Sequence, residues 1–119
     1  MTKNELGRRG EEIAAAYLDD IGMRVLERNW RCRDGEIDIV ALDRDTIVVV
    51  EVKTRSGPGA GHPLEAITPA KLARLRRLAI AWSLHDDEHR RRRLRIDAIG
   101  IVIQGGQAPE IIHLDGIVA

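Results

Sequence analysis

Residues 47–50 (IVVV) form an unbroken apolar stretch inside an otherwise charged part of the chain. All four residues are β-branched, and such residues favour an extended strand. Because successive side chains of a strand point to opposite faces of its sheet, an unbroken apolar stretch predicts a strand that is covered on both faces. The chain must therefore supply a layer of structure on each side of a central sheet.

Two helices are available to cover that strand. Thr2 and Glu5 have the spacing of a capping box, and apolar residues follow at helical intervals, so we expect a helix over residues 3–21. Thr68 is a typical N-cap and is followed by a proline, and we expect a second helix over residues 69–85.

Shorter apolar patterns between turn residues predict five strands. They are residues 23–31, 36–42, 47–54, 94–103 and 110–114. Residues 56–63 (SGPGAGHP) contain three Gly and two Pro, which predicts a loop before the second helix. The order α-β-β-β-α-β-β predicts an α/β fold in which a mixed sheet is flanked by helices, as one domain over residues 1–119.

Composition argues against several classes of protein. Aromatic residues make up 3% of the chain, with no Phe, which opposes the nucleic-acid modules that stack bases on exposed aromatic rings. The single cysteine, Cys32, cannot form an intramolecular disulfide or a cysteine-rich zinc site. With no apolar leader and no stretch long enough to cross a bilayer, we expect a soluble cytoplasmic protein without a membrane partner.

Charge is balanced overall but unevenly distributed. The chain has 19 basic and 19 acidic residues, whereas residues 71–95 contain nine basic residues against three acidic ones. Sixteen of the basic residues are Arg, whose planar guanidinium suits phosphate, although genomic base composition can produce the same bias.

The strands over residues 36–42 and 47–54 are close enough in sequence to form a hairpin. With a connection of two or four residues, paired positions sum to 89, so that Asp38 lies opposite Glu51 and Glu36 lies opposite Lys53. Two carboxylates facing each other across a sheet repel unless a cation lies between them, which predicts a divalent metal site. A register one residue out would send the two acids to opposite faces.

The alternative to a functional site is a network of structural ion pairs, because both arrangements perturb charges in the same way. Glu51 and Lys53 follow the apolar residues 47–50 on a strand that we expect to be covered on both faces. Charged side chains in such surroundings are costly unless they are paired or bound to a metal, and this favours the site.

The acid of one strand followed by Glu51-Val52-Lys53 on the next resembles the motif of the PD-(D/E)xK nuclease superfamily, which has the restriction-endonuclease-like fold. The chain as a whole resembles the YraN family, also called UPF0102. The matching stretches are residues 7–11 (GRRGE) with Ala14, Tyr17 and Leu18, then Asn29, residues 35–38 (GEID), residues 51–55 (EVKTR), Pro63, Lys71 and residues 95–97 (RID).

The resemblance implies a role for each residue at the predicted site. Asp38 and Glu51 would be the metal carboxylates for Mg²⁺ or Mn²⁺, with the Val52 carbonyl as a further ligand. Lys53 would be the catalytic lysine, orienting a water or stabilising charge on phosphorus. Glu11 would complete the metal site, whereas without the resemblance it would be interpreted as a solvated helix residue.

Several basic and polar residues near this hairpin are candidate phosphate contacts, since such contacts position a nucleic acid without reading its sequence. They are Thr54, Arg55, Lys71, Arg74 and Arg77. Each helix arginine could equally belong to an ordinary solvated face. His85 and His89 have the spacing of a zinc helix, but no Glu directly follows the first His, so the signal is weak.

We expect a nuclease that hydrolyses DNA phosphodiester bonds with Mg²⁺ or Mn²⁺, on branched, flapped or single-stranded DNA. This choice of substrate rests partly on analogy with resolvase-like nucleases. One alternative is a non-cleaving nucleic-acid binding module in recombination, repair or DNA uptake, and another is a protein-interaction domain. A homodimer would suit double-strand cleavage, although no surface feature of the sequence demands one.

Overall fold

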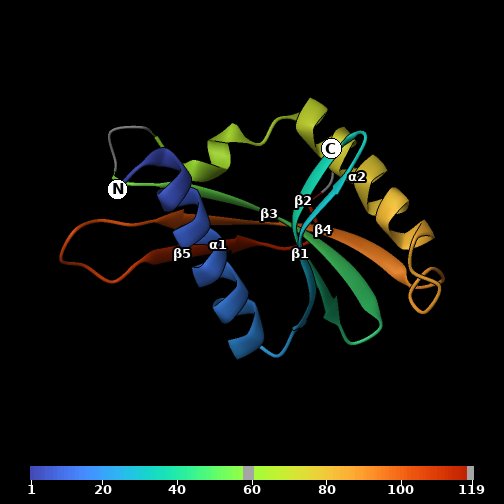
Figure 1. The fold of residues 1–119 in the computed structure, drawn as a ribbon. Coiled ribbons are helices and arrows are strands. Elements are labelled where there is room, and N and C mark those ends of the chain that lie inside the picture. Colours follow the sequence, from blue (N-terminus) through green and yellow to red (C-terminus); the bar gives the residue numbers. More distant parts are fainter. Residues whose placement is uncertain (58–60, 118–119) are drawn as a thin grey trace.

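The computed structural model describes residues 1–57 and 61–117. Its elements, shown in Figure 1, follow the predicted order with one short addition, η2. They are α1 (Lys3–Asp20), β1 (Arg24–Cys32), β2 (Gly35–Asp43), β3 (Thr46–Arg55), η2 (Pro63–Ala66), α2 (Pro69–Leu84), β4 (Arg93–Val102) and β5 (Glu110–Leu114). The predicted α/β class is therefore confirmed.

The loop predicted over residues 56–63 is wrong at its end, because Pro63 begins the 3-10 helix η2. His62 caps this helix by accepting a hydrogen bond from the Leu64 amide at 3.1 Å. Residues 58–60 of the predicted loop lie outside the described residues.

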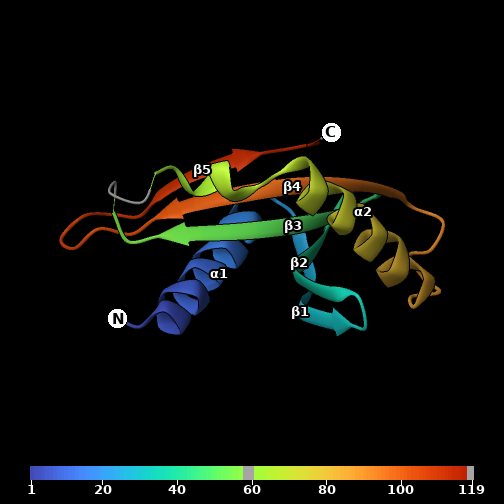
Figure 2. The same cartoon turned by 90° about the horizontal axis from the view of Figure 1, so that it is seen from above.

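The five strands form one mixed sheet in the order β1-β2-β3-β4-β5. β3 and β4 are parallel, whereas the other neighbouring pairs are antiparallel. A parallel pair needs a long crossover connection, which η2 and α2 provide. Figure 2 shows β3 and β4 running side by side through the middle of the sheet.

Side chains of β3 alternate between two apolar cores. Val48 and Val50 belong to the cluster that contains Ala14 and Leu18 of α1, and Val49 belongs to the cluster that contains α2. Residues 47–50 are all fully buried. One helix thus covers each face of the sheet, as the unbroken apolar stretch predicts. The buried residues of α2 are Leu72, Leu75, Leu78, Ala79, Trp82 and Ser83.

Helix α1 is held against the sheet at two places. At Gly10, which is buried, an added Cβ would lie 2.9 Å from the Cβ of Thr54 on β3. Further along the helix, the Tyr17 hydroxyl and His113 Nδ1 on β5 are 3.0 Å apart. The first contact requires glycine, and the second ties α1 to the last strand.

Asp97 on β4 is fully buried and is the centre of a polar network. Its carboxylate accepts hydrogen bonds from Arg95 Nε at 2.9 Å and from the Gly116 amide at 3.0 Å, and it lies 2.7 Å from His113 Nε2. Burial alone would raise the pKa of Asp97, but these hydrogen bonds together hold that pKa below its usual value. The network connects β4, β5 and the segment that follows β5.

The β1–β2 hairpin separates from β3 at its closed end. Pairing between β2 and β3 stops at Ile39 opposite Val50, although β2 begins at Gly35 and β3 continues to Arg55. We call this divergence of residues 35–38 from residues 51–55 the fork. The closed end of the hairpin lies beside α2 (Figure 1), where Gly35 approaches Arg74 and Leu78.

No described helix combines the length and the apolar character that a bilayer span requires.

Candidate active site

Asp38 and Glu51 meet at the base of the fork. The register of β2 and β3 pairs Ile39 with Val50 and Asp43 with Thr46, which are the pairs predicted from the sequence. Asp38 and Glu51 occupy the next positions beyond Ile39 and Val50, and their carboxyl groups are close enough to share a hydrogen bond. The predicted opposition of the two acids is therefore found in the structure.

Asp38 has surroundings that oppose its ionisation. Burial, the hydrogen bond with Glu51 and the charge of Glu51 raise the pKa of Asp38 to about 8, although the Val52 amide and Lys53 act in the opposite direction. Asp38 therefore keeps its proton at neutral pH unless another positive charge takes the place of that proton.

A cleft of about 220 Å³ opens at the two acids. Strands β2 and β3 contribute Glu36, Asp38, Glu51 and Lys53 to its lining, and α2 contributes Lys71, Arg74, Leu75 and Leu78. Glu51 and Lys53 point to the same face because they are two residues apart on one strand. The cleft thus combines carboxylates, an ammonium group next to them, and two further cations on the facing helix.

Glu11 approaches the same acids from α1. Burial and the negative charges of Asp38 and Glu36 raise the pKa of Glu11, and Arg28 and Asn29 oppose this shift. Glu11 is therefore part of an acid cluster, which we define as Glu11, Glu36, Asp38 and Glu51, and is not simply a solvated helix residue. The carboxylate oxygens that Glu11, Asp38 and Glu51 could offer to a metal do not all lie within 4.8 Å of one another. Among the described residues, Asp86, Glu88 and His89 are the group whose ligand atoms lie that close together.

Asn29 on β1 connects two members of the acid cluster. With its amide oxygen and nitrogen assigned to suit these partners, the nitrogen donates to Glu11 Oε1 at 2.9 Å and to Glu36 Oε1 at 3.1 Å. Its φ of 54° is in the left-handed region, which Asn adopts more readily than most residues. The sequence carries no direct signal for this conformation, and the link was missed for that reason.

The candidate phosphate contacts divide into two groups. Lys71 and Arg74 line the cleft. Thr54 does not, because it follows Lys53 by one residue, points to the opposite face and lies against Gly10 of α1. Arg77 is exposed on α2 but is not part of the lining, and Arg55 donates from Nη1 to the Thr54 carbonyl at 3.2 Å.

A second polar cluster lies after α2, where one ligand atom each from Asp86, Glu88 and His89 lie within 4.8 Å of one another. Asp86 Oδ1 already accepts hydrogen bonds from the amides of Glu88 and His89, and His89 Nδ1 accepts one from Arg92 at 3.0 Å. His85 is directed away to the carbonyl of its own helix. These contacts account for the cluster as the hydrogen bonding of a turn.

Relatives of this chain match almost its whole length. A protein named UPF0102 protein from Arthrobacter sp. (strain FB24) is 54% identical over 115 residues, which are 97% of each chain. The UPF0102 protein of Mycolicibacterium smegmatis is 50% identical over 119 residues, covering 98% of this chain and 95% of the relative.

The family model described as "Uncharacterised protein family UPF0102" matches residues 10–101. That range includes all four members of the acid cluster, together with Lys53, Lys71 and Arg74. On this match and on the similarity of the relatives, the chain belongs to the UPF0102 family.

Proposed function

We propose that this protein is a metal-dependent endonuclease of the PD-(D/E)xK type, with a restriction-endonuclease-like fold, that hydrolyses phosphodiester bonds in DNA. The observation that carries the proposal is the convergence of Asp38, Glu51 and Lys53 on one cleft at the fork. An ion-pair network alone would leave Asp38 buried beside Glu51 with the pKa of Asp38 raised, which lowers the stability of the folded protein at neutral pH and serves no function.

The donor set suits a hard divalent cation. Mg²⁺ and Mn²⁺ prefer oxygen ligands and are bound by one or two carboxylates together with water and substrate phosphate. Asp38 and Glu51 would hold the ion, assisted by Glu11 and by the Val52 carbonyl. When bound, the ion would neutralise phosphate charge and lower the pKa of a coordinated water.

Lys53 would supply the positive charge that the chain itself contributes to the reaction. Its ammonium group lines the cleft with the two acids. From there it would orient the attacking water or stabilise the charge that develops on the phosphoryl oxygens. Lys71 and Arg74 on the facing helix would hold phosphates next to the one that reacts.

The substrate would be recognised through its backbone. The three aromatic residues outside histidine are buried or partly buried, so none offers an exposed platform for base stacking. Without such a platform, selectivity would come from the shape of the DNA, as in branched, flapped or single-stranded substrates.

The proposal is tested by incubating labelled branched, linear and single-stranded DNAs with purified protein and Mn²⁺. Glu51→Gln and Lys53→Met should each lower the rate of cutting by at least about 100-fold. Glu12→Gln, which changes an exposed acid of α1 one position from Glu11, should cut like the wild type. Cutting that survives both cleft substitutions would come from a contaminant and would refute the proposal.

Binding without metal-dependent cutting would instead indicate a non-cleaving nucleic-acid binding module.

A further inference from the structure

A second concave surface lies beside the acid cluster, between α1 and β1. Its volume is about 860 Å³. Lys3, Asn4, Arg8 and Glu11 of α1 line one side, and Asn29 and Arg31 of β1 line the other. We call it the α1–β1 groove.

The α1–β1 groove is continuous with the acid cluster through two residues. Glu11 lines the groove and belongs to the cluster. Asn29 also lines the groove, and its amide joins Glu11 to Glu36, which lines the cleft on the other side of the fork. A ligand long enough to leave the cleft therefore meets this groove next.

The charges that line the α1–β1 groove are mainly positive. Lys3, Arg8 and Arg31 are all exposed, against the single carboxylate of Glu11. Arg31 Nε lies 3.3 Å from Glu36, which holds this cation near the acids while most of its side chain stays in solvent. The N-terminal end of α1 adds a partial positive charge on the same side.

This arrangement suits an extended polyanion better than a compact ligand. The acid cluster needs a metal ion before it can accept a phosphate. The basic residues on either side of the cluster can each bind a phosphate of one continuous strand. Lys71 and Arg74 provide the flank on the α2 side. The α1–β1 groove provides the flank on the other side.

We propose that the α1–β1 groove binds backbone phosphates of the DNA strand beyond the phosphate that occupies the acid cluster. The inference rests on the proposed function for the identity of the strand. It implies that the substrate extends on both sides of the reacting bond, so that an internal bond and not a terminal one is presented to Asp38 and Glu51.

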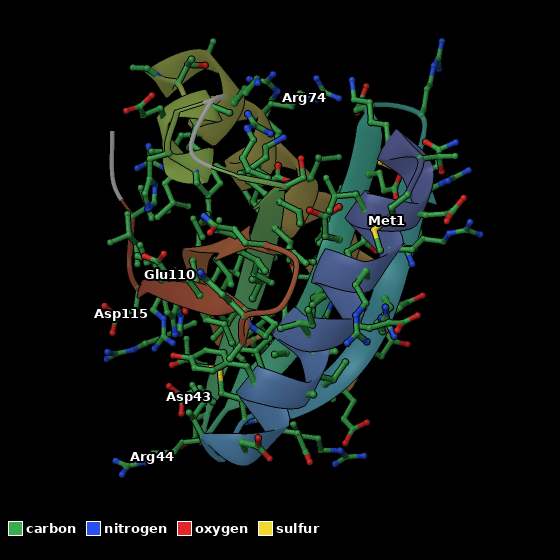
Figure 3. All side chains as sticks on the ribbon, turned by 90° about the vertical axis from the view of Figure 1, so that its left-hand side faces the viewer. Met1, Asp43, Arg44, Arg74, Glu110 and Asp115 are labelled. Carbon is green, nitrogen blue, oxygen red and sulfur yellow. The ribbon has the colours of Figure 1, made fainter. Side chains whose placement is uncertain are left out.

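The test measures DNA binding without cutting. Fluorescence anisotropy of a labelled single-stranded oligonucleotide of about 16 nucleotides is followed in EDTA for the wild type, for Arg8→Gln/Arg31→Gln and for a control, Arg24→Gln/Arg44→Gln. The control removes two exposed cations around the β2–β3 turn. Figure 3 shows Arg44 at the opposite end of the molecule from Arg74.

The groove variant should bind at least about 10-fold more weakly than the wild type, and the slope of log affinity against log salt should fall by about 1.4 for two lost phosphate contacts on a single strand. The control should bind within about 2-fold of the wild type, because salt largely screens the attraction between a phosphate and an exposed cation farther away than the Debye length. Equal affinity and slope for the groove variant and the wild type would overturn the inference, and so would no binding by the wild type.

This result is independent of cutting. If the groove variant loses binding while no protein cuts DNA with Mn²⁺, the groove assignment stands and the endonuclease proposal fails. If the wild type cuts and the groove variant binds normally, the endonuclease proposal stands and the groove assignment fails.

Discussion

The Val52 amide donates a hydrogen bond of 2.8 Å to Asp38 Oδ2. Val52 is on β3, just beyond the last residue pair that joins this strand to β2. The side chain of Asp38 thus takes a backbone donor of β3 at the point where the two strands diverge. Asp38 therefore links β2 to β3 beyond their last backbone pair, and its carboxyl group also lies beside that of Glu51.

We expect Asp38→Asn to change how the stability of the metal-free protein depends on pH. The pKa of Asp38 is raised to about 8 in the folded protein, above the value of about 3.9 for an unfolded chain. The stabilisation that comes from protonated Asp38 is fully present below about pH 3.9 and is lost progressively as the pH rises from there through about 8.

Asn keeps an acceptor for the Val52 amide but does not ionise. Between the unfolded and folded pKa values of Asp38, the free energy of unfolding of Asp38→Asn should therefore rise relative to that of the wild type by up to about 1.4 kcal/mol for each pH unit. Urea unfolding in EDTA at several pH values measures the difference. If the free energies of unfolding of the two proteins changed in parallel with pH, the pKa of Asp38 would not be raised by folding.

Mn²⁺ should raise the melting temperature of the wild type, because an ion that binds only the folded state stabilises it by about 2.7 kcal/mol at a hundredfold excess over its dissociation constant. Glu51→Gln should lose most of this gain, whereas Lys53→Met should keep it, since Lys53 is not a proposed ligand. Thermal unfolding with and without Mn²⁺ checks both. An equal gain in Glu51→Gln would place the ion elsewhere.

Gly10→Ala should destabilise the protein by about 1–3 kcal/mol, because the added methyl group overlaps the Thr54 side chain. Gly7→Ala is the matched control on the same helix. Nothing lies within 4 Å of a Cβ at Gly7, so this change should be neutral or stabilising by up to about 1 kcal/mol through helix propensity.

Chemical denaturation of Gly10→Ala, Thr54→Ala and the double variant measures their coupling. Thr54→Ala should recover part of the loss, making the double variant more stable than the sum of the single changes implies. Strict additivity would indicate that α1 shifts without meeting Thr54.

Asp97→Ala should cost about 3–5 kcal/mol, because it leaves Arg95 and the Gly116 amide without their buried acceptor. Asp43→Ala removes a more exposed partner of Arg95 and should cost about 1 kcal/mol or less. The pKa of Asp97 is lowered in the folded protein, so its contribution is present above the usual carboxyl pKa and is lost as the pH falls through the lowered value.

Urea unfolding near neutral pH and at acidic pH should therefore show a gap between the wild type and Asp97→Ala that closes in acid. A gap that stays constant would mean that packing, and not charge, accounts for the loss.

The β2–β3 hairpin could be predicted in detail because its features are local. A two-residue connection between Asp43 and Thr46 fixes the register, and the period of two then assigns Glu51 and Lys53 to one face. The same period of two predicts Thr54 on the opposite face from Glu51 and Lys53, and there it lies against Gly10 of α1 and not in the cleft.

Glu11 and Asn29 could not be positioned in the same way. Their meeting depends on where α1 crosses the sheet and on a left-handed residue within β1, and neither is encoded in spacing along the chain. The helix η2 was missed for a related reason, since four residues are too few to show a period.

The hydrogen bond between Tyr17 and His113 affects the position of Glu11, which it does not contact. Glu11 lies six residues before Tyr17 on α1, and Tyr17 connects this helix to the β4–β5 hairpin through His113 and Asp97. Strand β5 therefore helps to position Glu11 through α1. Loss of the Tyr17–His113 hydrogen bond should shift Glu11 relative to Asp38.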